Sequence, residues 1–484
     1  MIAPTATPVE RFFDRAFARA TGAAPVPGNR VRLLRDGGEN YAAWLESIAE
    51  AREWIHFESY IIHDDDVGLR FAEAMAARAR AGVRVRVLYD WLGSFQITPR
   101  KYARILQDAG AELRAVNPPH LGSPLAWLSR DHRKSIAIDG RIGYVSGLCV
   151  GQSWVGESAW RDTGIEVEGP AVAHIEDAFA DLWAHTGEPL PAGERINVGN
   201  IQAAGRLAVR VVASVPGATG MYRLDQLVAA AARKSLWLTD AYFIATTPYV
   251  QSLKAAAADG VDVRLLVPGS SDVPGVRAFT RAGYRALLEG GIRVFEWNGS
   301  MLHAKTAVAD TRWARVGSTN LNPSSWIGNW ELDVSIEDET FARQMEVMYE
   351  QDLMNATEIV IGRHRRMRPI DAPHASRGAG PDRRRRRRSR GRMTAGALGI
   401  GSAVGAALTR SRPLGAAEAR ILGGAAVLLV ALGIVGFMWP RVLSVPLAVL
   451  LVWTGLSVFA RAWQLHRAAN RTKVTERQGD GAAG

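Results

Sequence analysis

Residues 132–139 read HRKSIAID and residues 303–310 read HAKTAVAD, so one pattern of histidine, lysine and aspartate occurs twice in the chain. In an extended strand successive side chains alternate between faces, and a histidine and a lysine two positions apart point the same way. Each stretch therefore presents an imidazole and an ammonium group together. One match to so short a pattern arises easily by chance, whereas two matches at equivalent points of a repeat indicate a site.

The chain around the two motifs is duplicated as well. The apolar stretches WIHFESYII (54–62) and LWLTDAYFI (236–244) are each followed by a helical stretch, an apolar strand, a second helix and another strand. Strands that alternate with helices in this way predict βαβ units and largely parallel sheets. We therefore expect two similar α/β lobes that face each other across a cleft, with ligands bound beyond the carboxyl ends of the strands.

The excess of positive over negative charge lies entirely in the last quarter of the chain. Residues 1–360 hold 37 lysines and arginines against 43 acidic residues, whereas residues 361–484 hold 22 against 5. An enzyme that acts on nucleic acid usually carries its basic surface around the active site, so this distribution argues against a nucleic-acid substrate. Cys149 is the only cysteine, which excludes a disulfide within the chain and a zinc site of four cysteines.

Over about residues 28 to 355 these features resemble the phospholipase D superfamily. Further matches are DGRIGYVSG after the first motif, DTRWARVGSTNLNP after the second, and NWELDV beyond it; DDDVG and WRDTGIEVEGPAV look like the cardiolipin synthase branch in particular. The resemblance implies two pseudo-symmetric α/β/α sandwich lobes with one shared active site, and a transfer of phosphatidyl groups between phospholipids.

The resemblance also implies the roles of the motif residues. His132 and His303 are the expected catalytic histidines, and Lys134 and Lys305 are expected to bind the phosphate without a metal or a cofactor. A neutral imidazole is a competent nucleophile near pH 7, and a protonated one can act as a general acid. In the family the first motif usually supplies the nucleophile. His132 is therefore expected to form the phosphohistidine, and His303 is expected to be the acid that protonates the leaving alcohol.

Two acidic residues follow the motifs at similar spacing: Asp162 follows His132 by 30 residues, and Glu331 follows His303 by 28. The resemblance implies that such carboxylates pair with the catalytic imidazoles, and we expect Glu331 to orient His303. A carboxylate on the second ring nitrogen fixes the tautomer and stabilises the imidazolium.

The resemblance further assigns Asn320 as a donor to a phosphoryl oxygen and Ser318 as a supporting residue. Asp139 and Asp310 complete the two motifs, and we expect them to be structural rather than chemical. The position in the first half that corresponds to Asn320 is Cys149. A thiol is a poor substitute for an amide donor, so the two halves are expected to hold phosphate unequally.

The remainder of the chain predicts attachment to a membrane. Residues 421–439 and 442–460 carry no charge, and each would span ~28 Å as a helix, close to the ~30 Å of a bilayer core. The arginine run 383–388 is expected to meet an anionic membrane surface. Basic residues flank both ends of the hairpin and place the lobes on the cytoplasmic side of the inner membrane.

We accordingly divide the chain into seven segments. An N-terminal amphipathic helix and extension (1–27) precedes a first lobe (28–200) and a second lobe (201–360). A basic flexible linker (361–393), an interfacial or juxtamembrane segment (394–420), a transmembrane hairpin (421–463) and a polar tail (464–484) follow. Two stretches stay open. The apolar stretch 118–128 is either a packed surface loop or a lip that meets acyl chains, and 394–409 is either an interfacial helix or a third span.

The expected function is the synthesis of cardiolipin from two molecules of phosphatidylglycerol, with release of glycerol. The alternatives are a hydrolytic phospholipase D, which produces phosphatidic acid, and, less favoured, a nuclease of the same superfamily. The expected partners are phospholipid substrates and an anionic membrane, with no nucleic acid. The sequence leaves the oligomeric state open.

Overall fold

The computed structural model describes residues 8–94, 100–118, 128–196, 198–273, 276–361 and 367–369. The chain divides into two units, 1–410 and 411–484, and every described residue belongs to the first. The predicted juxtamembrane segment, hairpin and tail therefore lie outside the described residues, as does most of the apolar stretch 118–128. Of the predicted linker, only residue 361 and the short strand at 367–369 are described. No helix among the described residues is long and apolar enough to cross a membrane.

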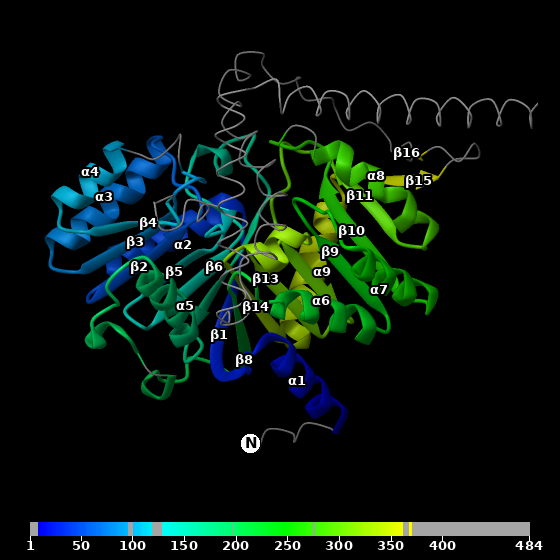
Figure 1. Cartoon of the computed structure of the whole chain (residues 1–484), viewed down its shortest axis with the longest axis horizontal. Helices are drawn as coiled ribbons and strands as arrows, with labels where there is room; N and C mark the ends of the chain where they lie inside the picture. Colours follow the sequence, from blue (N-terminus) through cyan, green and yellow to red (C-terminus); the bar gives the residue numbers. More distant parts are fainter. Residues whose placement is uncertain are drawn as a thin grey trace, which may run out of the picture. The chain divides into compact units, whose positions relative to one another are not determined.

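The described chain consists of two successive α/β halves, coloured blue to teal and green to yellow in Figure 1. After α1 (Pro8–Thr21), the first half contains β1 (Val26–Arg35), α2 (Asp36–Glu50), β2 (Trp54–Ser59), α3 (Asp66–Arg80), β3 (Arg84–Asp90), α4 (Arg100–Asp108), β4 (Glu112–Val116), β5 (Lys134–Ile138), β6 (Ile142–Ser146), β7 (Thr163–Glu168) and α5 (Val172–His185). The short 3₁₀ helix η2 (Gln152–Trp154) lies between β6 and β7.

The second half repeats this series. It contains β8 (Leu207–Ser214), α6 (Gly220–Ala231), β9 (Ser235–Thr239), α7 (Thr247–Ala258), β10 (Asp262–Pro268), α8 (Val276–Glu289), β11 (Arg293–Trp297), β12 (Thr306–Ala309), β13 (Trp313–Gly317), β14 (Glu331–Glu337), α9 (Glu339–Leu353), β15 (Ala356–Ile361) and β16 (Met367–Pro369). Strand order runs β4-β3-β2-β5-β6-β7-β1 in the first half and β11-β10-β9-β12-β13-β14-β8 in the second. The duplication expected from the sequence is therefore present in the topology.

The sheets are mixed, and the expectation of largely parallel sheets is wrong. Strands β2, β3 and β4 are parallel, as are β9, β10 and β11. All strands from β5 to β7 and from β12 to β14 pair antiparallel with their neighbours. The cause is the short connection: β5 ends at Ile138 and β6 begins at Ile142, and so few residues can form a hairpin but not a crossover.

Helices cover both faces of the sheets, and one core is shared between the halves. Helices α2, α3 and α4 pack on the first half around Phe71, and α6, α7 and α8 pack on the second half around Leu253. On the other face, α5 and α9 bury side chains such as Ile175 and Met345 in a common cluster with strands of both halves. An irregular antiparallel pairing of β1 with β8 joins the two sheets. The halves therefore meet along packed elements and not through a linker alone.

The motif aspartates form a turn at the far end of each motif strand. Asp139 and Asp310 both have positive φ angles, 54° and 53°. The carboxylate of Asp139 accepts hydrogen bonds from the backbone N–H groups of Arg52, Glu53 and Trp54, each at 2.8 Å. The carboxylate of Asp310 accepts the equivalent bonds from Arg233, Lys234 and Ser235. At ~3.3 Å per residue an extended segment separates Asp310 from His303 by up to about 23 Å. These contacts support the structural role expected for both aspartates, which stays a prediction.

Replacing Asp310 with alanine should lower the free energy of unfolding by about 2 kcal/mol, because several backbone donors at the start of β9 lose their acceptor. Urea unfolding measures this change, with Asp259→Ala as a control, since Asp259 is exposed and its side chain is not used in this turn. Turnover per folded molecule should stay close to that of the wild type. Lost turnover at unchanged stability would instead assign Asp310 to the chemistry.

Candidate active site

Both motif histidines lie where the two halves meet. His132 stands two residues before β5 and His303 three before β12, so they occupy extended segments that lead into the strands, and not the strands themselves as expected. The backbone N–H of His132 donates to the carbonyl of Trp330 at 2.9 Å, and that of His303 donates to the carbonyl of Arg161 at 2.7 Å. Each motif is thus hydrogen-bonded to the other half, just before its acidic residue.

This backbone pairing makes the imidazole–carboxylate pairs cross between the halves. Nδ1 of His132 donates to Glu331 Oε2 at 2.9 Å, and Nδ1 of His303 donates to Asp162 Oδ2 at 2.8 Å. The expectation that Glu331 orients His303 is therefore wrong. Glu331 orients the histidine of the first motif, because the residue before each carboxylate is hydrogen-bonded to the opposite motif.

Each carboxylate has a further donor that fixes it. Asp162 Oδ2 also accepts from the indole N–H of Trp154 at 3.0 Å, and Asp162 Oδ1 accepts from the backbone of Thr163 at 2.9 Å. Glu331 Oε2 accepts from the hydroxyl of Ser318 at 2.5 Å, which is the supporting position expected for that serine. The two carboxylates are fully buried, so these bonds hold them in a single orientation toward the imidazoles.

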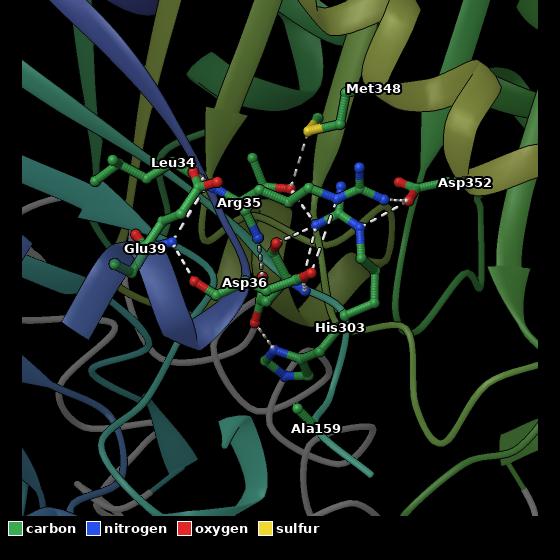
Figure 2. Close-up of polar contacts among 12 residues, drawn as sticks. Leu34, Arg35, Asp36, Glu39, Ala159, His303, Met348 and Asp352 are labelled. Carbon is green, nitrogen blue, oxygen red and sulfur yellow. Dashed lines mark hydrogen bonds and ion pairs between the residues drawn. The ribbon is translucent and has the colours of Figure 1, made fainter. Parts of the chain in front are cut away.

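A buried arginine ties Asp162 to helices of both halves. Figure 2 shows Asp36, Asp352 and His303, which surround this group of contacts. Arg161 Nε donates to Asp352 Oδ1 on α9 at 2.8 Å, and its guanidinium also donates to Asp36 Oδ1 at the start of α2 at 3.1 Å. Asp36 in turn accepts from the backbone N–H of Asp162 at 3.0 Å. Sequence reasoning missed Arg161, Asp36 and Asp352, and only the string WRDTG pointed toward this segment.

A lysine and a tyrosine accompany each histidine. Lys134 Nζ donates to the carbonyl of His132 and lies 5.0 Å from the ring centre of Tyr60. The edge of that ring faces His132 at 4.9 Å between ring centres. Tyr60 follows β2 and was not singled out in the sequence.

The second half has the same arrangement. Lys305 Nζ donates to the carbonyl of His303 and lies 3.0 Å from Nδ1 of the same imidazole. The ring of Tyr242 stands edge-on to His303 at 5.8 Å, and Trp154 and Trp160 from the first half approach the imidazole at 5.7 and 5.5 Å. His303 is therefore enclosed by three aromatic rings.

Burial and nearby lysines keep both imidazoles neutral. Burial lowers the pKa of His132 to about 4; Glu331 opposes this change, and Lys134 adds to it. Burial, followed by the charge of Lys305, lowers the pKa of His303 to about 3 although Asp162 opposes it. In the free protein at pH 7 neither histidine is protonated, so the acid expected at His303 must gain its proton when the site changes charge.

The two carboxylates and Lys305 keep their charges near pH 7. Burial raises the pKa of Asp162, but His303 and Lys305 together outweigh it and leave the pKa below its ordinary value. The pKa of Glu331 is lowered in the same way, with His132 as the main opposing influence to burial. Burial lowers the pKa of Lys305 to about 8, and Lys134 adds to this decrease.

The amide expected to hold a phosphoryl oxygen and its counterpart in the first half are both buried. The carboxamide oxygen of Asn320 has no hydrogen-bond partner within the described residues. Cys149 is 2 % exposed, and burial raises the pKa of its thiol while Lys134 and Lys305 oppose the rise. The thiol is therefore neutral at pH 7 and within electrostatic reach of both lysines. Among the described residues, no group of three or more histidine, cysteine and acidic side chains is arranged to hold a metal ion.

Comparison with known proteins places the chain in a family. Residues 226–353 match the family described as cardiolipin synthase, PLD-like domain. A cardiolipin synthase of Alkalihalophilus pseudofirmus is 32% identical over 353 residues, which cover 71% of this chain and 70% of the relative. The chain belongs to the cardiolipin synthase family. Cardiolipin synthase A of Pseudomonas aeruginosa is 33% identical over 353 residues, with 71% of each chain covered.

The fold agrees with this assignment. The crystal structure of phosphatidylserine synthase from Haemophilus influenzae superposes with a TM-score of 0.58 and 15% identity, covering 71% of this chain and 91% of that one. This likeness shows the mixed α/β fold of the phospholipase D superfamily. The resemblance read from the sequence is confirmed.

We expect kcat/KM to fall as the pH rises through about 8, because Lys305 then loses the charge that would attract a phosphate. Lys305→Arg should lose this alkaline decline, since a guanidinium stays protonated there. Lys134→Arg serves as the matched control and should retain the decline. Initial rates on detergent-dispersed phospholipid across the neutral and alkaline range measure it. An identical alkaline decline in Lys305→Arg would show that another group titrates.

Proposed function

We propose that this phospholipase D-type phosphatidyltransferase moves the phosphatidyl group of one phosphatidylglycerol to the headgroup hydroxyl of a second, so that cardiolipin forms and glycerol leaves. Membership of the cardiolipin synthase family implies phospholipid substrates and association with a membrane. The observation that carries the proposal is the pair of buried histidines with crossed carboxylates, at 2.9 and 2.8 Å, each beside a lysine. Such a pair supplies a nucleophile and a proton donor in one place.

The first half-reaction follows from the free ring nitrogens. Nδ1 of each imidazole is committed to a carboxylate, which leaves Nε2 for chemistry. In the proposal His132 Nε2 attacks the phosphorus, a P–N bond forms, and the P–O bond to glycerol breaks. The glycerol oxygen takes the proton of His303. Lys134 and Lys305 balance the charge on the phosphoryl oxygens, which is where fixed positive charge stabilises a transition state most.

The second half-reaction reverses these roles. His303 is now neutral and accepts the proton of the incoming hydroxyl, whose oxygen forms the new P–O bond as the P–N bond breaks. The negative phosphodiester favours a protonated imidazole beside it, so substrate binding supplies the condition under which His303 can hold its proton. Asp162, at 2.8 Å from the ring, stabilises the imidazolium meanwhile.

The setting in the cell is part of the proposal. The uncharged stretches within 421–463 would form the hairpin that anchors the enzyme in the inner membrane, with the lobes on the cytoplasmic side and the arginine run 383–388 against anionic lipid. The division of the chain into seven segments given above belongs to the same proposal. All support for the membrane segments comes from the sequence pattern.

Expression in bacterial cells that lack cardiolipin should restore it, as lipid extraction and mass spectrometry would show. Cells that express His132→Ala at equal protein levels provide the control and should stay without cardiolipin. Accumulation of phosphatidic acid in place of cardiolipin would identify a hydrolase instead. An unchanged lipid profile with folded protein in the membrane fraction would overturn the proposal.

The assignment of the nucleophile can be tested with a phospholipid that bears a good leaving group, which hardly needs an acid. With this substrate His303→Ala should still form an acid-labile, alkali-stable phosphoenzyme that maps to His132, whereas His132→Ala should form none. Label on His303 would reverse the two roles. Label on neither histidine would remove the covalent intermediate.

A further inference from the structure

The loop after β10 brings a carboxylate to the active site that neither histidine uses. Asp272 lies four residues beyond the end of β10, at the carboxyl ends of the parallel strands β9, β10 and β11, where ligands bind in sheets of this kind. Its Oδ1 accepts a hydrogen bond from the hydroxyl of Tyr242 at 2.8 Å. Because the ring of Tyr242 stands edge-on to His303 at 5.8 Å, one side chain separates Asp272 from the proposed acid.

The charge of Asp272 also affects the pKa of Tyr60, on the other half of the site. Burial is the main reason that the pKa of Tyr60 is raised, and the carboxylates of Asp90 and Asp272 add smaller increases. Tyr60 belongs to the first half and faces His132 at 4.9 Å. Asp272 therefore lies within electrostatic reach of Tyr60 in the first half as well as in contact with Tyr242 in the second.

Among the described residues, no basic side chain forms an ion pair with this carboxylate. Asp272 is partly exposed, and within the described residues it takes part in no ion pair and accepts a hydrogen bond only from Tyr242. Asp162 and Glu331, in contrast, are fully buried and each is paired with an imidazole. One oxygen of Asp272 thus stays available to a molecule in the site.

A free carboxylate is an unfavourable neighbour for a phosphodiester, because the two negative charges repel each other. For a neutral polyol the same group is favourable, since it accepts charge-assisted hydrogen bonds from hydroxyl groups. Acidic side chains hold the hydroxyls of ribose in dinucleotide-binding folds for this reason. The chemistry of Asp272 therefore fits the uncharged part of a substrate and not its phosphate.

The proposed reaction presents such a group twice. In the first half-reaction the leaving group is glycerol, and in the second the acceptor is the glyceryl headgroup of another phosphatidylglycerol. Both carry a hydroxyl on the carbon next to the one that bears the reacting oxygen, and both must place that reacting oxygen beside the same histidine. A single subsite for this neighbouring hydroxyl can therefore serve both half-reactions.

We propose that Asp272, together with Tyr242, forms this subsite and binds the hydroxyl that neighbours the reacting oxygen of the glyceryl group beside His303. The inference rests on the proposed function and adds the determinant of its acceptor. It explains why an acidic residue faces a site for an anionic substrate. It also places the diol on the side of His303, where a proton must be given to the leaving oxygen and taken from the incoming one.

The test is a competition between two small alcohols in one reaction mixture. The full-length enzyme is given phosphatidylglycerol in mixed micelles with equal concentrations of 1,2-propanediol and 1-propanol, and the two phosphatidyl alcohols are quantified by mass spectrometry. The wild type should favour the diol about tenfold, the size expected for one charge-assisted hydrogen bond. In Asp272→Ala the ratio should fall to near one, and in Asp272→Asn it should lie between. Asp259→Asn, an exposed aspartate on the α7–β10 turn, should keep the ratio of the wild type.

The ratio of two products does not depend on how much of a variant is folded, because a smaller active fraction lowers both alike. A wild type without preference for the diol, or an Asp272→Ala variant that keeps the full preference, overturns the subsite. Cardiolipin formation without added alcohol is measured in parallel and reports on the proposed function. If cardiolipin is absent while the preference and its loss in Asp272→Ala persist, the proposed function fails and the subsite stands.

Discussion

The crossed pairing of two imidazoles with two carboxylates is the constraint on which the rest of the site depends. Glu331 and Asp162 are fully buried, and a carboxylate left unpaired in such surroundings would cost several kcal/mol. The ring nitrogen that faces each carboxylate belongs to the histidine of the opposite half, at 2.9 and 2.8 Å. The register between the halves is thereby tied to the geometry of the histidines, and neither half contains a complete site.

The two halves share a topology but differ in how they hold their carboxylates. A side-chain carbon at Gly147, which corresponds to Ser318, would lie 2.1 Å from Asp162 Oδ1. The first half has no room for a serine there, and the indole of Trp154 donates to Asp162 in its place. A reaction with one nucleophile and one acid requires different surroundings for its two histidines. The departures at Gly147 and Trp154 provide that difference within a duplicated frame.

The sequence predicted which residues form the site better than how they are connected. The two motifs could be found because their spacing and residue types repeat along the chain, whereas Ser318 and both carboxylates were implied by the resemblance to the family. The exchange of partners could not, since Glu331 is equally placed in the sequence whether it serves its own half or the other. It depends on the hydrogen bonds of His132 to Trp330 and of His303 to Arg161, which join segments far apart in the chain. The mixed sheets do not follow from the βαβ pattern for a simpler reason. The β5–β6 connection is so short that it allows a hairpin but not a crossover.

The electrostatics of the site make its chemistry depend on its substrate. Burial holds the pKa of His303 at about 3, and Lys305 contributes to that low value. An imidazole in this state cannot act as an acid at pH 7, because burial and the charge of Lys305 outweigh the opposing effect of Asp162 on its pKa. A bound phosphodiester brings a negative charge that raises the pKa of the imidazole. His303 therefore becomes protonated only when a substrate whose P–O bond is to be broken is present. Once glycerol has taken the proton, the same surroundings return His303 to its neutral form. It is then ready to act as the base for the next hydroxyl, while the aromatic rings of Trp154, Trp160 and Tyr242 leave little space around it for water.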